Sequence, residues 1–212
     1  MAVKNFVGFI LLSIVACMLV SCSHNVHDEI FAHLDAALEL EQEFIESQEK
    51  LNELEERDME IYDALMELDA VDEGRLQSLT DEALQNVSER MKLLEEERNS
   101  IIQSKEEFQK IEPLIEEVEK DAIKEKLENL FQTMMERYEA YDEVYETYVE
   151  SLYLTENLYN HFKNEAAYTV LYETLEEVNR SYEKLFKAND KFNVLTKQYN
   201  RLKQEYYDMM GE

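Results

Sequence analysis

The chain has 212 residues, with 49 acidic and 21 basic side chains and a formal net charge of −28 at pH 7. A field of that sign repels nucleic acid, so the composition excludes a protein that binds DNA or RNA. Three glycines and one proline are too few for the tight turns of a sheet-rich fold, and abundant Glu, Leu and Lys favour long helices. We therefore predict an all-α protein.

The first 21 residues have the pattern of a secretory signal peptide. Lys4 precedes an apolar stretch that runs from Phe6 to Val20. As a helix this stretch would span only ~22 Å, less than the ~30 Å hydrocarbon layer of a membrane. We expect residues 1–21 to be removed rather than kept as a membrane-spanning helix.

The apolar stretch ends in Leu19, Val20, Ser21 and Cys22, which is the order of an aliphatic, a tolerant and a small residue before a cysteine. This order resembles the lipobox of bacterial lipoproteins. The small residue admits the signal peptidase, and the cysteine thiolate is the nucleophile that accepts a diacylglyceryl group. The resemblance implies cleavage before Cys22, recognition through residues 19–21, and attachment of Cys22 to the membrane by acyl chains such as palmitate.

A second sequence, Ile14 to Cys17, fits the same pattern. Cleavage there would leave apolar residues 18–20 behind the anchor, whereas Cys22 is followed by a polar segment that we interpret as a linker over residues 22–28. We therefore favour Cys22. The mature chain then has no free thiol and no disulfide, and loss of Lys4 takes its net charge to −29.

Apolar residues at intervals of three and four predict a first helix from about His27 to Asp69. Its apolar positions include Leu34, Leu38, Ile45 and Leu65. A break is expected around Gly74, followed by a second helix whose N-cap is Ser78.

The second helix carries apolar residues from Leu84 to Ile111, Ile102 among them, before Pro113 introduces a kink or a boundary. The same spacing continues beyond the proline, so residues 79–163 form either two helices with a turn near Glu119–Asp121 or one long kinked helix. The first alternative gives an antiparallel four-helix bundle about 60 Å long, and the second a thin rod of roughly twice that reach.

We favour the first alternative, an elongated antiparallel bundle of about four coiled-coil-like helices over residues 29–212. Asn164 is expected to end the third helix in a left-handed C-cap conformation. A final helix follows, with apolar residues from Leu171 to Tyr206.

Four tyrosines recur at helical spacing: Tyr138, Tyr141, Tyr145 and Tyr148. Such a stripe either packs in a helix seam, with its hydroxyls reaching polar partners, or stacks on sugar rings when it is exposed. We favour packing in the core.

Three histidines, His24, His27 and His33, lie close to Asp28 and Glu29, and such side chains can bind zinc or copper. His27 and His33 are six residues apart and do not share a helical face, so we predict no metal site; His161 has no evident partner. The many paired carboxylates are interpreted as solvated helix faces. With no glycine-rich phosphate loop, no Ser/His/Asp set and no mature cysteine, we predict no catalytic residue, no cofactor and no small-molecule substrate.

Three stretches complete the pattern: "SKEEFQKIEPLIEEVEK" at 104–120, "RYEAYDEVYETYVESLYLTENLY" at 137–159 and "ANDKFNVLTKQYN" at 188–200. Together with the lipobox they resemble the YkyA-like family of cell-wall-binding lipoproteins from Bacillus-type Gram-positive bacteria. The resemblance implies a protein that is lipid-anchored at the outer face of the cytoplasmic membrane, within reach of peptidoglycan or another wall polymer.

We therefore predict a non-enzymatic, membrane-anchored lipoprotein that binds cell-wall material or envelope proteins. Its net charge repels anionic wall polymers unless divalent cations or D-alanyl amines bridge the contact. An extracytoplasmic chaperone or assembly factor for exported proteins is the alternative. A wall hydrolase ranks third, since no pair of carboxylates is singled out by a cleft.

Overall fold

The computed structural model describes residues 26–68, 72–164 and 166–211. Within them lie six helices: α1 Val26–Leu40, α2 Gln42–Met66, α3 Glu73–Phe108, α4 Ile111–Glu116, α5 Asp121–Lys163 and α6 Tyr168–Met210. The described residues contain no strand, and the prediction of an all-α protein is confirmed. The predicted signal segment, the lipobox residues Leu19, Val20, Ser21 and Cys22, and His24 lie outside the described residues.

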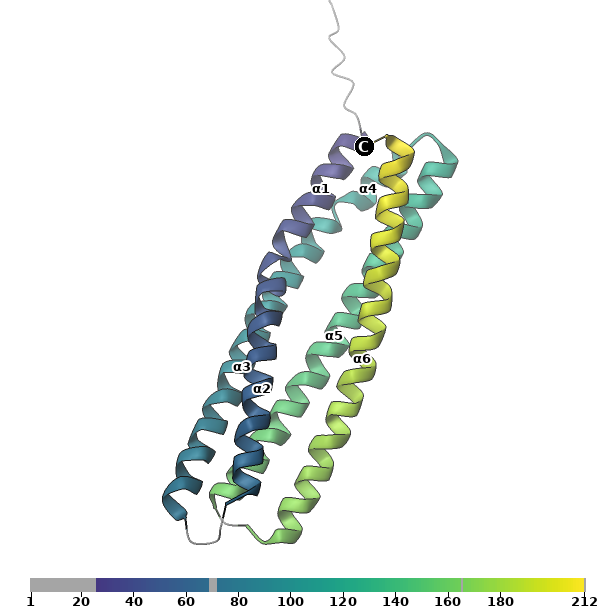
Figure 1. Cartoon of the computed structure of the whole chain (residues 1–212). Helices are drawn as coiled ribbons and strands as arrows, with labels where there is room; N and C mark the ends of the chain where they lie inside the picture. The colour runs from purple at the N-terminus through teal and green to yellow at the C-terminus, as the bar shows by residue number, and fades with distance from the viewer. Residues whose placement is uncertain (1–25, 69–71, 165, 212) are drawn as a thin grey trace, which may run out of the picture.

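The helices form an elongated antiparallel four-helix bundle (Figure 1). Its first long helix is made of α1 and α2 in succession, and the other three are α3, α5 and α6. The short α4 lies in the connection between α3 and α5. The start of α1 and the end of α6 lie at the same end of the bundle. With 43 residues, α5 is ~64 Å long. The bundle is confirmed, and the alternative of a single long rod is wrong.

Two of the predicted helix boundaries lie where expected. The turn near Glu119–Asp121 is present, because α5 begins at Asp121. Pro113 lies in the first turn of the short α4, after α3 has ended at Phe108. A proline is tolerated there because the first N–H groups of a helix have no carbonyl partner within the helix.

Two predicted caps differ from the structure. Ser78 is not an N-cap: α3 begins at Glu73, because the Asp72 carboxylate accepts a hydrogen bond from the Arg75 backbone N–H at 3.1 Å. Asn164 does follow the last residue of α5, but its φ of −96° is not left-handed. Its side-chain amide instead donates to the Asn160 carbonyl at 2.8 Å, an oxygen that also accepts the Asn164 backbone N–H at 3.1 Å.

The helix predicted from His27 to Asp69 is broken at Glu41, between α1 and α2. The Ser100 hydroxyl of α3 donates to the Leu40 carbonyl at 2.6 Å and accepts from the Phe44 backbone N–H at 3.3 Å. In an unbroken helix these two backbone groups would bond to each other. An inserted side chain thus causes the break, and it leaves Glu41 buried with only 6% of its surface exposed.

The core runs along the whole bundle as one cluster of buried side chains. Three predicted core residues are exposed instead: Leu38, Ile45 and Ile102. Ile102 is displaced from the core because its neighbour Ile101 occupies the inward position, and consecutive residues of a helix point about 100° apart. Leu38 and Ile45 flank the break at Glu41. No described helix has an apolar stretch that meets the requirements for crossing a membrane.

Replacing Ser100 with alanine tests the cause of the break. We expect S100A to lower the free energy of unfolding by about 1–3 kcal/mol, because the part-buried Leu40 carbonyl and Phe44 N–H lose their partner. Urea unfolding followed by circular dichroism measures the change. S88A is the matched control, since Ser88 lies exposed on the same helix. Equal effects of the two substitutions would contradict this role of Ser100.

Candidate ligand-binding groove between α2 and α6

The bundle is not closed equally on all sides. Helix α6 packs along α5 and α2 packs along α3, but among the described helices α6 makes no extensive backbone approach to α1 or α2. A cavity of about 390 Å³ lies on this side, lined from α2, α3, α5 and α6. A second cavity of about 240 Å³ continues along the seam towards α1 and shares Phe44, Arg137 and Thr196 with the first. We call the two cavities together the groove.

A buried ion pair separates the two cavities. The Arg137 guanidinium donates from both terminal nitrogens to the two carboxylate oxygens of Glu41, each at 2.7 Å, and from Nε to the Thr196 hydroxyl at 2.9 Å. It also lies 4.7 Å from the centre of the Phe192 ring. Because the pair is bidentate and both side chains are almost fully buried, each charge is compensated by the other. The pair links the break between α1 and α2 to α5, and Arg137 also contacts Thr196 and Phe192 of α6.

Glu97 lines the first cavity, and its environment differs from that of the Glu41–Arg137 pair. Its side chain is 1% exposed, and its Oε2 accepts a hydrogen bond from the Gln48 amide at 2.7 Å. No ion pair joins it to a lysine or arginine of the described residues. Burial raises the pKa of the Glu97 carboxyl to about 7, and hydrogen bonding to the charged form offsets only part of that rise.

The Tyr141 hydroxyl lies beside the same carboxylate, but no hydrogen bond of ordinary geometry joins the two groups. The hydroxyl is fully buried and makes no hydrogen bond within the described residues. Burial and the neighbouring Glu97 raise the pKa of Tyr141, so it stays protonated. The cavity therefore presents one carboxyl without a cation and, beside it, one buried hydroxyl that makes no hydrogen bond of ordinary geometry within the described residues.

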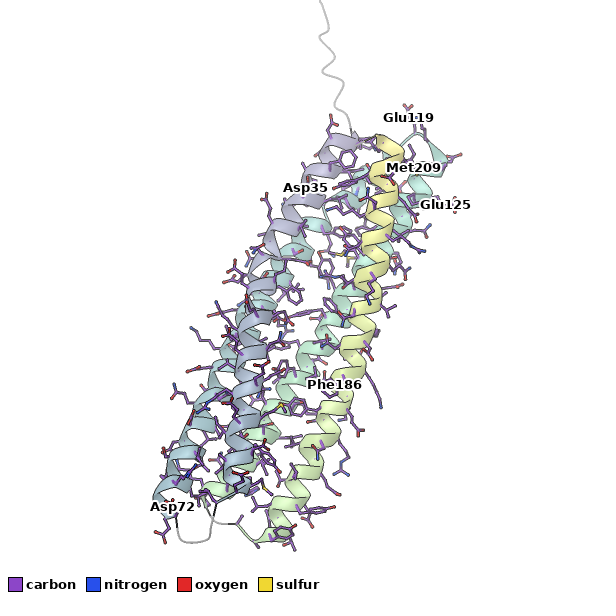
Figure 2. All side chains as sticks on the ribbon, in the orientation of Figure 1. Asp35, Asp72, Glu119, Glu125, Phe186 and Met209 are labelled. Atoms are coloured by element: carbon purple, nitrogen blue, oxygen red, sulfur yellow. The ribbon has the colours of Figure 1, made fainter. Side chains whose placement is uncertain are left out.

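The walls of the first cavity are aromatic. The rings of Phe44, Tyr141 and Phe192 meet in three edge-to-face contacts, with ring centres 5.8, 5.8 and 5.9 Å apart. Phe186 stands on the solvent side, 64% exposed, and Figure 2 shows it on the side of α6 that faces α2. Leu38 and Ile45, both more than half exposed, line the second cavity.

A second polar cluster, around Arg90, borders the first cavity through Glu55, Tyr148 and Tyr182. Arg90 is 1% exposed, and its Nη2 donates to the Tyr182 hydroxyl at 2.8 Å and to the Tyr148 hydroxyl at 3.2 Å. Its guanidinium lies 3.4 Å from Asp58 and 3.5 Å from Glu55. Buried charges need such partners, so this cluster meets a structural requirement that the Glu97 carboxyl does not meet.

The preference for a tyrosine stripe in the core is confirmed. Tyr138, Tyr141 and Tyr148 are at most 6% exposed, and Tyr145 is half-buried with the Arg98 guanidinium 4.2 Å from its ring centre. The alternative interpretation, an exposed stripe that stacks on sugar rings, is wrong for these positions. Tyrosine hydroxyls serve instead as the polar ends of buried clusters, as Tyr138 does with Ser104 at 2.8 Å.

The two described histidines of this group, His27 and His33, have different partners. His27 Nδ1 lies 2.9 Å from the Tyr206 hydroxyl, whereas His33 Nδ1 lies 2.7 Å from a Glu107 carboxylate oxygen. Among the described residues, no group of three or more His, Cys, Asp or Glu side chains is arranged to hold a metal ion.

Sequence reasoning missed four charged residues of the interior: Glu41, Arg90, Glu97 and Arg137. A signal for two of them is present on α3, where the inward residues step by three and four: Val87, Arg90, Leu94, Glu97, Ile101, Ser104 and Phe108. Arg90 and Glu97 occupy places in this series that apolar residues usually take. A charged residue at such a place indicates a buried polar group.

The raised pKa of Glu97 makes stability depend on pH. The unfolded chain loses this proton near pH 4.5 and the folded chain near pH 7, so the contribution of Glu97 to stability falls as pH rises through that window. We expect E97Q to be more stable than the wild type by up to about 3 kcal/mol at pH 8, and to show little difference at pH 4. Urea unfolding of both proteins between pH 4 and pH 8 measures this difference in the free energy of unfolding.

The matched control is E95Q, because Glu95 is exposed on the same helix. Its free energy of unfolding should differ from that of the wild type by the same small amount at every pH. A wild-type minus E97Q difference that does not change between pH 4 and pH 8 would show that Glu97 ionises in the folded protein as in water.

Three comparisons with known proteins bear on identity. A family model described as "Putative cell-wall binding lipoprotein", YkyA, matches residues 25–209. The uncharacterized lipoprotein YkyA of Bacillus subtilis (strain 168) is 34% identical over 185 residues, which cover 87% of this chain and 83% of the relative.

Among solved structures, a conserved protein of unknown function from Staphylococcus aureus matches with a TM-score of 0.75, over 85% of this chain and 93% of the other. At 19% identity this likeness supports the fold alone. The family match spans every described helix except the last residue of α6. The chain belongs to the YkyA family of lipoproteins.

Proposed function

We propose that this protein is a lipid-anchored, non-enzymatic component of the Gram-positive cell envelope, whose acidic bundle binds cell-wall material or envelope proteins. The family match over residues 25–209 carries the proposal, because the family is described by lipid attachment and wall binding and not by a reaction. A membrane-anchored place in the envelope follows from the same description.

The proposed anchor is Cys22, exposed as the new N-terminus after recognition of Leu19, Val20 and Ser21. Cys22 precedes the first residue of α1, Val26, by four positions, a distance that an extended chain spans in at most ~14 Å. A diacylglyceryl group supplies two acyl chains, which suffice for stable attachment where one would be marginal. The end of the bundle that holds the start of α1 and the end of α6 would then lie next to the membrane.

Charge favours a bundle that stands away from the lipid surface. Asp35, Glu119 and Glu125 lie at or near the proposed membrane end, whereas Asp72 lies at the opposite end (Figure 2). Carboxylates at that end repel anionic headgroups, so the acyl chains have to provide the attachment. An upright bundle would present its far end, where α2 gives way to α3, roughly 60 Å from the membrane and closer to the wall.

Replacing Cys22 with serine tests the anchor. We expect C22S to leave the membrane fraction and to lack the mass of a diacylglyceryl group, since serine provides no thiolate. C17S is the matched control and should remain on the membrane with its lipid. Membrane fractionation and mass spectrometry of the N-terminal peptide measure both. Lipid on C22S, or its loss in C17S, would move the anchor to Cys17.

Cosedimentation with purified sacculi tests the binding activity. We expect the detergent-solubilised protein to sediment with sacculi, and more strongly with calcium than with a chelator, because divalent ions reduce repulsion between the acidic bundle and anionic wall polymers. Sacculi stripped of those polymers serve as the control for charge. If no protein sediments under any of these conditions, wall material is removed as a partner, and envelope proteins captured by crosslinking in cells take its place.

A further inference from the structure

The first cavity of the groove has the properties of a site for a small organic ligand. Its volume of about 390 Å³ falls within the range of cavities that hold such ligands. Its lining includes the Phe44, Tyr141 and Phe192 rings, which contact one another, and further along α6 the exposed Phe186 and the polar side chain of Asn189. An apolar or aromatic body thus finds aromatic rings in the lining of the cavity.

The chemical group at the bottom of this cavity identifies the charge of the ligand. Glu97 is a buried carboxyl that accepts a hydrogen bond from the Gln48 amide at 2.7 Å, and no lysine or arginine of the described residues forms an ion pair with it. Tyr141 adds a buried hydroxyl without a hydrogen-bond partner there. A group with several N–H donors and a positive charge would satisfy both oxygens and compensate the carboxylate.

The basic residue that lines the cavity does not fill this role. Arg137 also lines the cavity, but both of its terminal nitrogens are bonded to Glu41. Because that pair is electrically neutral, it neither compensates Glu97 nor strongly repels a second cation. Arg98 lies over the Tyr145 ring and 3.9 Å from Asp142. The carboxyl of Glu97 is therefore left for an external cation.

We propose that the cavity binds an organic amine, in which a primary ammonium contacts Glu97 and the Tyr141 hydroxyl while an attached aromatic or aliphatic body packs between Phe192 and Phe186. An ammonium provides three donors, enough for the carboxylate and the hydroxyl together. The surrounding rings also stabilise a cation through their negative faces. This site is independent of wall binding, because its chemistry lies inside the bundle.

The test uses 2-phenylethylammonium as the probe and the full chain in detergent micelles. By isothermal titration calorimetry at pH 8 we expect saturable binding at concentrations up to about 10 mM. The neutral analogue 2-phenylethanol has the same shape and should bind at least about tenfold more weakly, since it lacks the charge that Glu97 requires. Equal affinity for the amine and the alcohol, or no saturable binding of the amine, would overturn the proposal.

Two variants locate the site. E97Q, which we expect to fold at least as stably as the wild type, should weaken amine binding at least about tenfold, whereas E95Q should leave it unchanged. F186A removes only an exposed ring and should weaken binding several-fold without affecting the fold. Amine affinity in the wild type should also fall between pH 8 and pH 5.5, as Glu97 takes up a proton, and should not fall in E97Q. Wild-type affinity in both E97Q and F186A would place the amine elsewhere.

Discussion

The buried ion pair between Glu41 and Arg137 is the contact on which the shape of this bundle depends. Glu41 reaches the interior only because the first helix is interrupted there, and the interruption exists because the Ser100 hydroxyl takes the place of a backbone hydrogen bond between Leu40 and Phe44. The carboxylate then meets Arg137 of α5, which also binds Thr196 of α6. Glu41, which lies outside the regular helices, thereby connects the junction of α1 and α2 with α5 and α6 on the open side of the bundle.

Such a pair contributes more to the uniqueness of the packing than to stability. The loss of hydration of two charges offsets most of their attraction, and an apolar pair of similar volume is often as stable. A carboxylate and a guanidinium in bidentate contact, however, allow only one register between their helices. We interpret the pair as the element that holds α2 and α6 at a fixed separation, with side chains and cavities rather than close backbone contact between them.

The three charged clusters of the interior differ in charge compensation, because Arg90 and Arg137 contact carboxylates whereas Glu97 forms no ion pair with a lysine or arginine of the described residues. Arg90 has two hydroxyls and two carboxylates around it, and Arg137 has Glu41 and Thr196. Glu97 has Gln48 and an unbonded hydroxyl, and it lies in the larger cavity. A buried carboxyl without a cation, next to a cavity, is the observation on which the proposed amine site rests.

The sequence alone determined the helical character, the bundle, the turn at Asp121, the end of α5 at Lys163 and the inward position of the tyrosine stripe, because helical periodicity and turn residues are local properties of the chain. It also provides the lipobox at Cys22, on which the proposed anchor rests. Only the tertiary structure decided the break at Glu41, the burial of Arg90, Glu97 and Arg137, and the exposure of Leu38 and Ile45. Each of these depends on contacts between helices far apart in the chain: Ser100 lies 56 residues from Phe44, and Arg137 lies 96 residues from Glu41. The spacing of apolar residues along one helix shows which face turns inward. The side chains that this face contacts are set by how the helices pack against one another.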